Sequence, residues 1–394
     1  MSGLVMDESL HCRIVVFGDD WGRHPSSSQF LVGGLLPQCE TLWVNSVGMR
    51  SPTLRLRDLR RIVERLQGIG RATPAAEAAT GPTPRIVQPR FLPYHHIGAA
   101  RSLNQRLIGG QVRARLAELP PAPTVAWVSN PMAAYLLETF DYDYLIYYCG
   151  DEFTGMRDVH VPEVIRQEDW LLGQADLCAY ASTALSRAKA DRQTGDTVLL
   201  AHGVQIEKFP ATPPAPHPSL ADLTHPVLGF FGSFQDWIDV SLVESVAKQR
   251  PDWTICLVGV PDERVLQLDA LPNIRVCGRV PHHELPQYAA NWDAAMLIYD
   301  AAHPFTAGIS PLKAYEYFAL GLPTVSTCPF PDLDGQAFLH VGQDVASYIA
   351  AAEAALATTS EQRLQIRQVA ERNTWAQRVD LLRATLSRAL ADRT

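Results

Sequence analysis

A lysine and a glutamate one helical turn apart, Lys313 and Glu316, interrupt the otherwise apolar stretch GISPLKAYEYFALGLPTV (308–325). The ammonium group of a lysine can neutralise a diphosphate, and a carboxylate can accept two hydrogen bonds from a ribose diol. The alternative is an ordinary i,i+3 ion pair on a helix surface, worth only about a few tenths of a kcal/mol. The surroundings of the two side chains decide between these interpretations.

The residues around this pair predict where its helix begins and ends. Ser310 is expected as the N-cap, Pro311 as the first helical residue and Gly321 as the C-terminal stop. A buried strand pattern, 293–299, precedes the helix, so the helix N-terminus should open at the carboxyl end of a parallel strand. Unpaired N–H groups and the positive end of the helix dipole make such a place an anion site, which favours a diphosphate over an ion pair.

A second group of side chains could move a proton. Asp151 follows the buried run LIYYCG and should therefore lie at the carboxyl end of a strand. We expect it to be the general base, with neighbouring Glu152 raising its pKa by like-charge repulsion. Asp20 and His24, in the loop after the first predicted strand, are the second candidates. The alternative role for Asp151 is to cap a helix or turn.

Alternating strand and helix patterns predict an α/β protein with parallel sheets. Buried strand patterns in the first half start at residues 12, 41, 124, 144 and 177, and the alternation restarts at 227 after a proline-rich stretch (EKFPATPPAPHPSLADLTHP, 207–226). The chain ends in helical patterns over about 345–356 and 361–390. At 394 residues it is long enough for two domains, and we expect a ligand between them.

Composition excludes several classes of function. No run of 18 apolar residues exists, and the seven scattered cysteines fit a reducing compartment better than a zinc site or a disulfide framework. The Asp-x-Asp tripeptides at 141–143 and 332–334 are too common to predict a metal site, and no metal is expected. Nucleic acid is not an expected partner either, since no known nucleic-acid-binding module occurs.

Charge is distributed unevenly along the chain, whose net charge is −8. Residues 50–115 hold 13 arginines against three acidic residues, and 54–66 form an amphipathic helix pattern with arginines on one side. Such a helix can lie in an anionic membrane interface, or it can pack on its own domain with a solvated basic face.

The stretch SPLKAYEYFALGLPTV resembles the nucleotide-sugar site of GT-B glycosyltransferases, in the branch close to glycosyltransferase family four. YYCGDEFTG, ADLCAYASTALSRAK and LLAHGVQIEKF resemble further segments of these proteins. The resemblance implies two Rossmann-like domains facing a central cleft. They would be an acceptor-binding domain (1–209), a linker (210–225), a donor-binding domain (226–370) and a C-terminal helix (371–394) that crosses back to the first domain.

The resemblance also implies roles for individual residues. Glu316 would bind the ribose, and Ser310, Pro311, Leu312 and Lys313 would form the diphosphate site. The base would meet the turn of Gly278, Arg279 and Val280, and the phosphate side of the cleft would be lined by Gly232 and Ser233. Where the family carries a second glutamate that touches the sugar, eight residues before Glu316, this chain has Gly308. The resemblance therefore fixes neither the donor sugar nor the anomeric outcome.

The expected function is transfer of a sugar from a nucleotide sugar, with UDP as the expected nucleotide, to a glycan or lipid-linked acceptor in polysaccharide or envelope biosynthesis. No cofactor is expected besides this co-substrate. The expected place is the cytoplasm, with peripheral binding to the inner face of the cytoplasmic membrane. The alternative is a GT-B protein that transfers no sugar, either an epimerase-like enzyme or an inactive nucleotide-sugar-binding partner.

Overall fold

The computed structural model describes residues 10–23, 26–49, 82–156 and 159–393, which form two compact units. The first unit comprises Met1–Ala201 together with Arg378–Thr394, and the second comprises His202–Gln377. The proline-rich stretch expected as a linker, 210–225, falls inside the second unit, where Leu220 is fully buried in the core.

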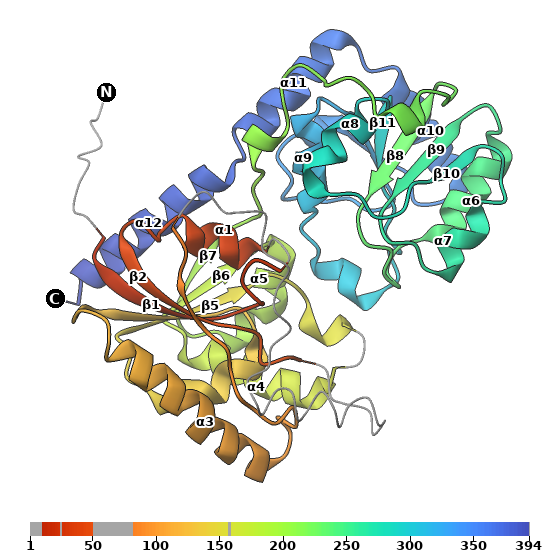
Figure 1. Ribbon diagram of the computed structural model, residues 1–394. Helices are drawn as coiled ribbons and strands as arrows, with labels where there is room; N and C mark the ends of the chain where they lie inside the picture. Colours follow the sequence, from red (N-terminus) through yellow and green to blue (C-terminus); the bar gives the residue numbers. More distant parts are fainter. Residues whose placement is uncertain (1–9, 24–25, 50–81, 157–158, 394) are drawn as a thin grey trace, which may run out of the picture. The chain divides into compact units, whose positions relative to one another are not determined.

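A seven-stranded parallel sheet forms the centre of the first unit, with strand order β3-β2-β1-β4-β5-β6-β7 (Figure 1). The order reverses between β1 and β4, and this is the place in such sheets where ligands bind beyond the carboxyl ends of the strands. The strands are β1 (Cys12–Phe17), β2 (Cys39–Val44), β3 (Arg85–Val87), β4 (Thr124–Val128), β5 (Tyr144–Cys149), β6 (Leu177–Tyr180) and β7 (Asp196–Leu199).

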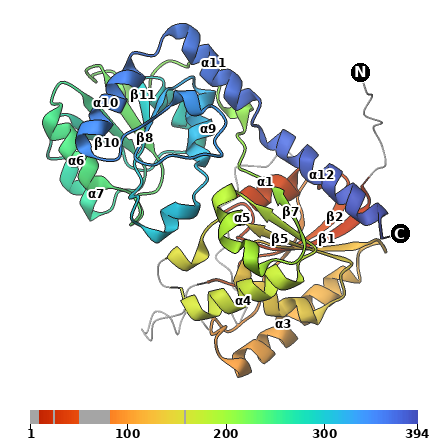
Figure 2. The ribbon, with the colours of Figure 1, turned by 180° about the vertical axis from the view of Figure 1, so that it is seen from behind.

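Helices cover both faces of this sheet, with α1 and the end of α12 on one face and α3 and α4 on the other (Figures 1 and 2). The indole of Trp127 on β4 donates to Ser28 on α1 over 3.1 Å, which ties that helix to the centre of the sheet. The helices are α1 (Ser27–Gly33), α3 (Gly98–Leu116), α4 (Val161–Gln174), α5 (Thr183–Lys189) and α12 (Trp375–Ala391). A run of 3-10 helix, Pro131–Thr139, follows β4.

The second unit has a six-stranded parallel sheet in the order β10-β9-β8-β11-β12-β13, with its reversal between β8 and β11. The strands are mostly apolar and buried on both faces, as parallel sheets require. They are β8 (Val227–Phe231), β9 (Thr254–Val258), β10 (Ile274–Val276), β11 (Ala294–Leu297), β12 (Thr324–Ser326) and β13 (Leu339–Val341).

In this unit α6 and α7 cover one face of the sheet, and α8 and α9 cover the other (Figure 1). The helices are α6 (Val240–Gln249), α7 (Glu263–Leu268), α8 (Leu285–Ala289), α9 (Leu312–Ala319), α10 (Val345–Leu356) and α11 (Ser360–Glu371). The helical pattern predicted over 361–390 is broken into α11 and α12, and Asn373 between them bonds the carboxylate of Asp334 over 2.8 Å.

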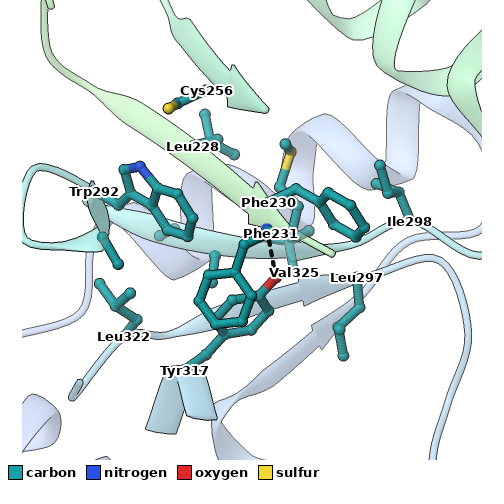
Figure 3. Packing of buried hydrophobic residues seen from close by; sticks show 14 of the residues in the cluster. Leu228, Phe230, Phe231, Cys256, Trp292, Leu297, Ile298, Tyr317, Leu322 and Val325 are labelled. Atoms are coloured by element: carbon teal, nitrogen blue, oxygen red, sulfur yellow. Dashed lines mark hydrogen bonds between the residues drawn. The ribbon is translucent and has the colours of Figure 1, made fainter. Parts of the chain in front are cut away.

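The core of the second unit fixes α9 to the central strand. Phe231, the last residue of β8, packs against Tyr317 on α9 with ring centres 4.6 Å apart, and Trp292 lies next to both rings (Figure 3). The backbone N–H of Phe231 donates to the hydroxyl of Tyr317 over 3.2 Å. This buried hydrogen bond ties α9 to the end of β8.

None of the helices in the described ranges is long and apolar enough to cross a membrane. The amphipathic helix predicted over 54–66 lies outside the described residues.

Candidate functional site

The helix that carries Lys313 and Glu316 starts later than the sequence predicts. Pro311, not Ser310, is the N-cap, and α9 begins at Leu312. The carbonyl of Ser310 accepts the N–H of Leu312, and that of Pro311 accepts the N–H of Ala314, both over 3.0 Å. The predicted side-chain cap is absent because the backbone carbonyls of this turn take up those N–H groups. At the other end Gly321 has a φ of 68°, the left-handed geometry of a helix stop.

Lys313 extends toward the strand ends. Its ammonium nitrogen lies 5.6 Å from the centre of the Phe230 ring and 5.9 Å from that of Tyr299, at the ends of the neighbouring strands β8 and β11. Among the described residues it forms no ion pair, so the surface i,i+3 pair considered for Lys313 and Glu316 is not what the structure has. The ring faces stabilise the cation without neutralising it.

Gly232 leaves the space into which this lysine extends. Its φ of 147° is open mainly to glycine, and a Cβ built there would lie 2.2 Å from Cε of Lys313. Gly232, the first residue of the predicted phosphate-side pair Gly232 and Ser233, is therefore next to the ammonium group at the point where the strand order reverses.

Glu316 bonds a histidine from another loop. Its Oε1 lies 3.0 Å from Nε2 of His282, and only 12% of the Glu316 side chain is exposed. In the part of the chain that the structure describes, no side chain or backbone group bonds its second oxygen, Oε2. The sequence alone predicts an ordinary surface or core histidine at position 282, because the carboxylate that it meets lies 34 residues away.

The turn predicted to meet the base follows β10. Gly278 has a φ of 66°, and its carbonyl accepts the N–H of Gly259 over 2.7 Å. Arg279 is exposed and Val280 is half-buried, and the 3-10 helix His282–Glu284 begins directly afterwards. This turn therefore lies in the same loop as the histidine that bonds Glu316.

In the first unit, Asp151 lies just after β5, as the sequence predicts, and it is half-buried. Burial raises its pKa to about 6, and the carboxylate of Asp19 after β1 adds a smaller increase. The like charge is therefore Asp19, not Glu152 as expected. The carboxyl ends of parallel strands meet at one edge of the sheet, and this brings together groups that are far apart in the sequence.

Glu152 faces a buried ion-pair network instead. Its carboxylate accepts hydrogen bonds from Thr154 (2.6 Å) and Lys189 (3.1 Å). Although burial raises the pKa of Glu152, these two partners hold it below the ordinary value. Lys189 also bonds Glu168 over 2.8 Å, and the side chains of Lys189 and Glu168 are 1% and 2% exposed. This network anchors the segment directly after Asp151.

The other predicted proton-transfer residues differ from Asp151. Asp20 accepts the N–H of Ser46 over 3.1 Å and pairs with Arg23 at 3.3 Å, so its carboxylate holds a loop together. His24 lies outside the described residues.

Within the described ranges no three His, Cys, Asp or Glu side chains gather as metal ligands, and in the first Asp-x-Asp tripeptide Asp143 accepts the N–H of Thr124 at 2.7 Å.

Known proteins resemble this chain in sequence and in fold. Residues 225–359 match the family described as glycosyl transferases group 1. The chain has the GT-B fold of glycosyltransferases. A curated relative, the putative teichuronic acid biosynthesis glycosyltransferase TuaH of Bacillus subtilis, is 28% identical over 235 residues. That match spans 54% of this chain and 58% of the relative.

Solved structures share the GT-B fold along nearly the whole chain. Sucrose-phosphate synthase from Thermosynechococcus elongatus aligns with a TM-score of 0.67 at 14% identity, covering 98% of this chain and 100% of that one. Anabaena HepE in complex with UDP and glucose aligns with a TM-score of 0.61 at 14% identity, covering 95% and 99%. At this identity the likeness concerns the fold.

Proposed function

We propose that this protein transfers a sugar from a UDP-sugar to a hydroxyl group of a glycan or lipid-linked acceptor in polysaccharide biosynthesis. The observation that carries the proposal is the ammonium of Lys313, which has no carboxylate partner in the described residues and lies beside Gly232 at the head of α9. The choice of donor is supported by the HepE structure, which is a complex with UDP and glucose. The choice of reaction is supported by TuaH, a putative teichuronic acid biosynthesis glycosyltransferase.

Sugar transfer breaks the bond between the anomeric carbon and the diphosphate oxygen and forms one to the acceptor oxygen. Negative charge develops on the departing diphosphate, and Lys313 with the positive end of the α9 dipole would stabilise it. Glu316 would accept the two ribose hydroxyls, and the Gly278–Val280 turn would contact the base. The proposal needs no metal or other cofactor, so turnover should persist in EDTA.

The acceptor hydroxyl must lose its proton as it attacks, and Asp151 is the proposed base. With a pKa of about 6 this carboxylate is mostly ionised at neutral pH, yet it is more basic than an ordinary aspartate. Asp20 is the weaker candidate because both of its oxygens already hold partners.

The first experiment screens nucleotides and nucleotide sugars by thermal shift. UDP at a hundredfold excess over its dissociation constant should stabilise the folded protein by about 2.7 kcal/mol. Release of UDP from the UDP-sugar that binds best is then followed with candidate acceptors. Asp151→Asn should cut this release about 10²–10⁴-fold with nucleotide affinity unchanged. UDP binding without turnover on any acceptor would favour the non-transferring alternative, and no binding of any nucleotide would end the proposal.

The proposed acceptor class includes lipid-linked glycans, because the arginine-rich sequence of residues 50–115 fits an anionic membrane surface. Salt-sensitive sedimentation with anionic liposomes should be lost when Arg55, Arg57, Arg60 and Arg61 become glutamine. No sedimentation even at low salt would favour an acceptor that is free in solution.

A further inference from the structure

The contact between His282 and Glu316 joins two parts of the donor site that are separate in the sequence. His282 begins the 3-10 helix after the Gly278–Val280 turn, whereas Glu316 lies one turn into α9. Nε2 of the imidazole and Oε1 of the carboxylate are 3.0 Å apart. The ring of Phe209 meets the imidazole edge-on, with centres 6.0 Å apart.

The surroundings of the imidazole indicate which nitrogen carries the proton. Nδ1 of His282 is buried and has no hydrogen-bond partner among the described residues. A proton there would be an unsatisfied buried donor, whereas a proton on Nε2 can be donated to Glu316. The neighbouring carboxylate of Glu284 lies 3.8 Å from His283, so it has a different histidine next to it.

A carboxylate without a hydrogen-bond partner can rotate about its side-chain bonds, and fixing it when a ligand binds costs conformational entropy. The bond from His282 removes part of that freedom before any ligand arrives. It uses one acceptor position of Oε1 and leaves Oε2 open, so two ribose hydroxyls can still be accepted.

We propose that His282 is a positioning residue for nucleotide recognition, which holds the Glu316 carboxylate in the orientation that the ribose diol requires. This inference rests on the proposed function, since it assigns a further residue to the same donor site.

The test measures dissociation constants of UDP, 2′,3′-dideoxy-UDP and pyrophosphate by calorimetry. His282→Ala should weaken UDP binding about tenfold and leave binding of the dideoxy analogue and of pyrophosphate unchanged, because neither offers a ribose diol. In a Glu316→Ala background the same change should have no further effect. His282→Gln should retain binding within about threefold, since its amide N–H can replace Nε2–H. His283→Ala, at a 62% exposed neighbour, is the matched control.

An equal loss for UDP and its dideoxy analogue, or a loss that adds to that of Glu316→Ala, would mean that His282 only supports the fold. If both His282 variants bind UDP as tightly as wild type does, the inference is wrong, and the proposed function is unaffected. A wild-type protein that binds no UDP would overturn both. If His282→Ala does not fold, the comparison of UDP with its dideoxy analogue is made on His282→Gln and on Glu316→Ala.

Discussion

Each unit contains a lysine with limited exposure to solvent, and the two lysines have opposite surroundings. Lys189 in the first unit lies between two carboxylates, at 2.8 Å from Glu168 and 3.1 Å from Glu152. Lys313 in the second unit has aromatic rings and a glycine loop around it and, within the described residues, no carboxylate. The first cation is neutralised inside the fold, and the second is available to an anion from outside.

The comparison distinguishes a charge that stabilises the fold from a charge that can bind a ligand. A buried ion pair whose partner is removed leaves an uncompensated charge in a medium of low polarity. A half-exposed cation without a partner keeps part of its hydration, so the fold can carry it. Substitution at Lys189 should therefore affect stability, whereas substitution at Lys313 should affect ligand binding.

The largest effect is expected for Lys189→Met, which keeps the length of the side chain but removes its charge. Glu168 would remain buried and lose its nearest cation, keeping the Tyr147 hydroxyl at 2.6 Å and Arg192 at only 3.8 Å. The free energy of unfolding should therefore fall by about 3 kcal/mol in urea titrations. Lys248→Met is the matched control, because Lys248 is 58% exposed and pairs with Glu244 on the surface, and it should cost less than about 1 kcal/mol. Equal effects of the two variants would mean that the buried network does not anchor this unit.

A smaller effect is expected for Gly232→Ala. The left-handed φ of 147° should cost about 1–3 kcal/mol of stability, and the added methyl group would displace the side chain of Lys313. UDP affinity should then fall as well as stability. Gly321→Ala carries a similar backbone strain at the other end of α9 without touching Lys313, so it should lower stability alone. If Gly232→Ala binds UDP as tightly as wild type does, this loop is not part of the diphosphate site.

The smallest effect concerns the stability of Asp151→Asn. In the folded protein the pKa of Asp151 is raised to about 6 from an ordinary value near 3.8, so folding disfavours its ionised form. The penalty is complete above about pH 6 and vanishes as the pH falls below about 4. Asparagine lacks this penalty, so the variant should be more stable than wild type at pH 7.5 by about 1 kcal/mol, after allowance for solvent screening. A variant that is less stable at pH 7.5 would show that the carboxylate has a supporting role.

Most strands and the α9 region could be predicted because their signals are local. Apolar runs mark the central strands, and the patterns predicted to start at residues 12, 124, 144 and 177 are the strands β1, β4, β5 and β6. The sequence does not predict the edge strands β3 and β7, because they are mostly exposed and carry no apolar pattern, as in Arg85–Val87. Short strands of this kind are fixed by pairing with a neighbour and not by their own sequence.

The site could be predicted only where neighbours in sequence are also neighbours in space. Lys313 and Glu316 belong to one recognisable stretch, but the partners of the two candidate carboxylates, Asp151 and Glu316, lie elsewhere in the sequence. Asp19 acts on Asp151 across the sheet edge, and His282 reaches Glu316 from another loop. The late start of α9 has a different cause, since carbonyl groups replace the serine side chain that usually caps such a helix.

The central claim is that Lys313 is held open for a nucleoside diphosphate. The most direct measurement is a calorimetric titration of UDP into wild type, Lys313→Ala and the control Lys248→Ala. A charge-assisted contact worth about 1.5–3 kcal/mol predicts that Lys313→Ala binds UDP about 10–150-fold more weakly. Its thermal unfolding should match that of wild type, and Lys248→Ala should bind UDP as wild type does. Wild-type affinity in Lys313→Ala, or a loss of affinity that accompanies unfolding, would contradict the claim.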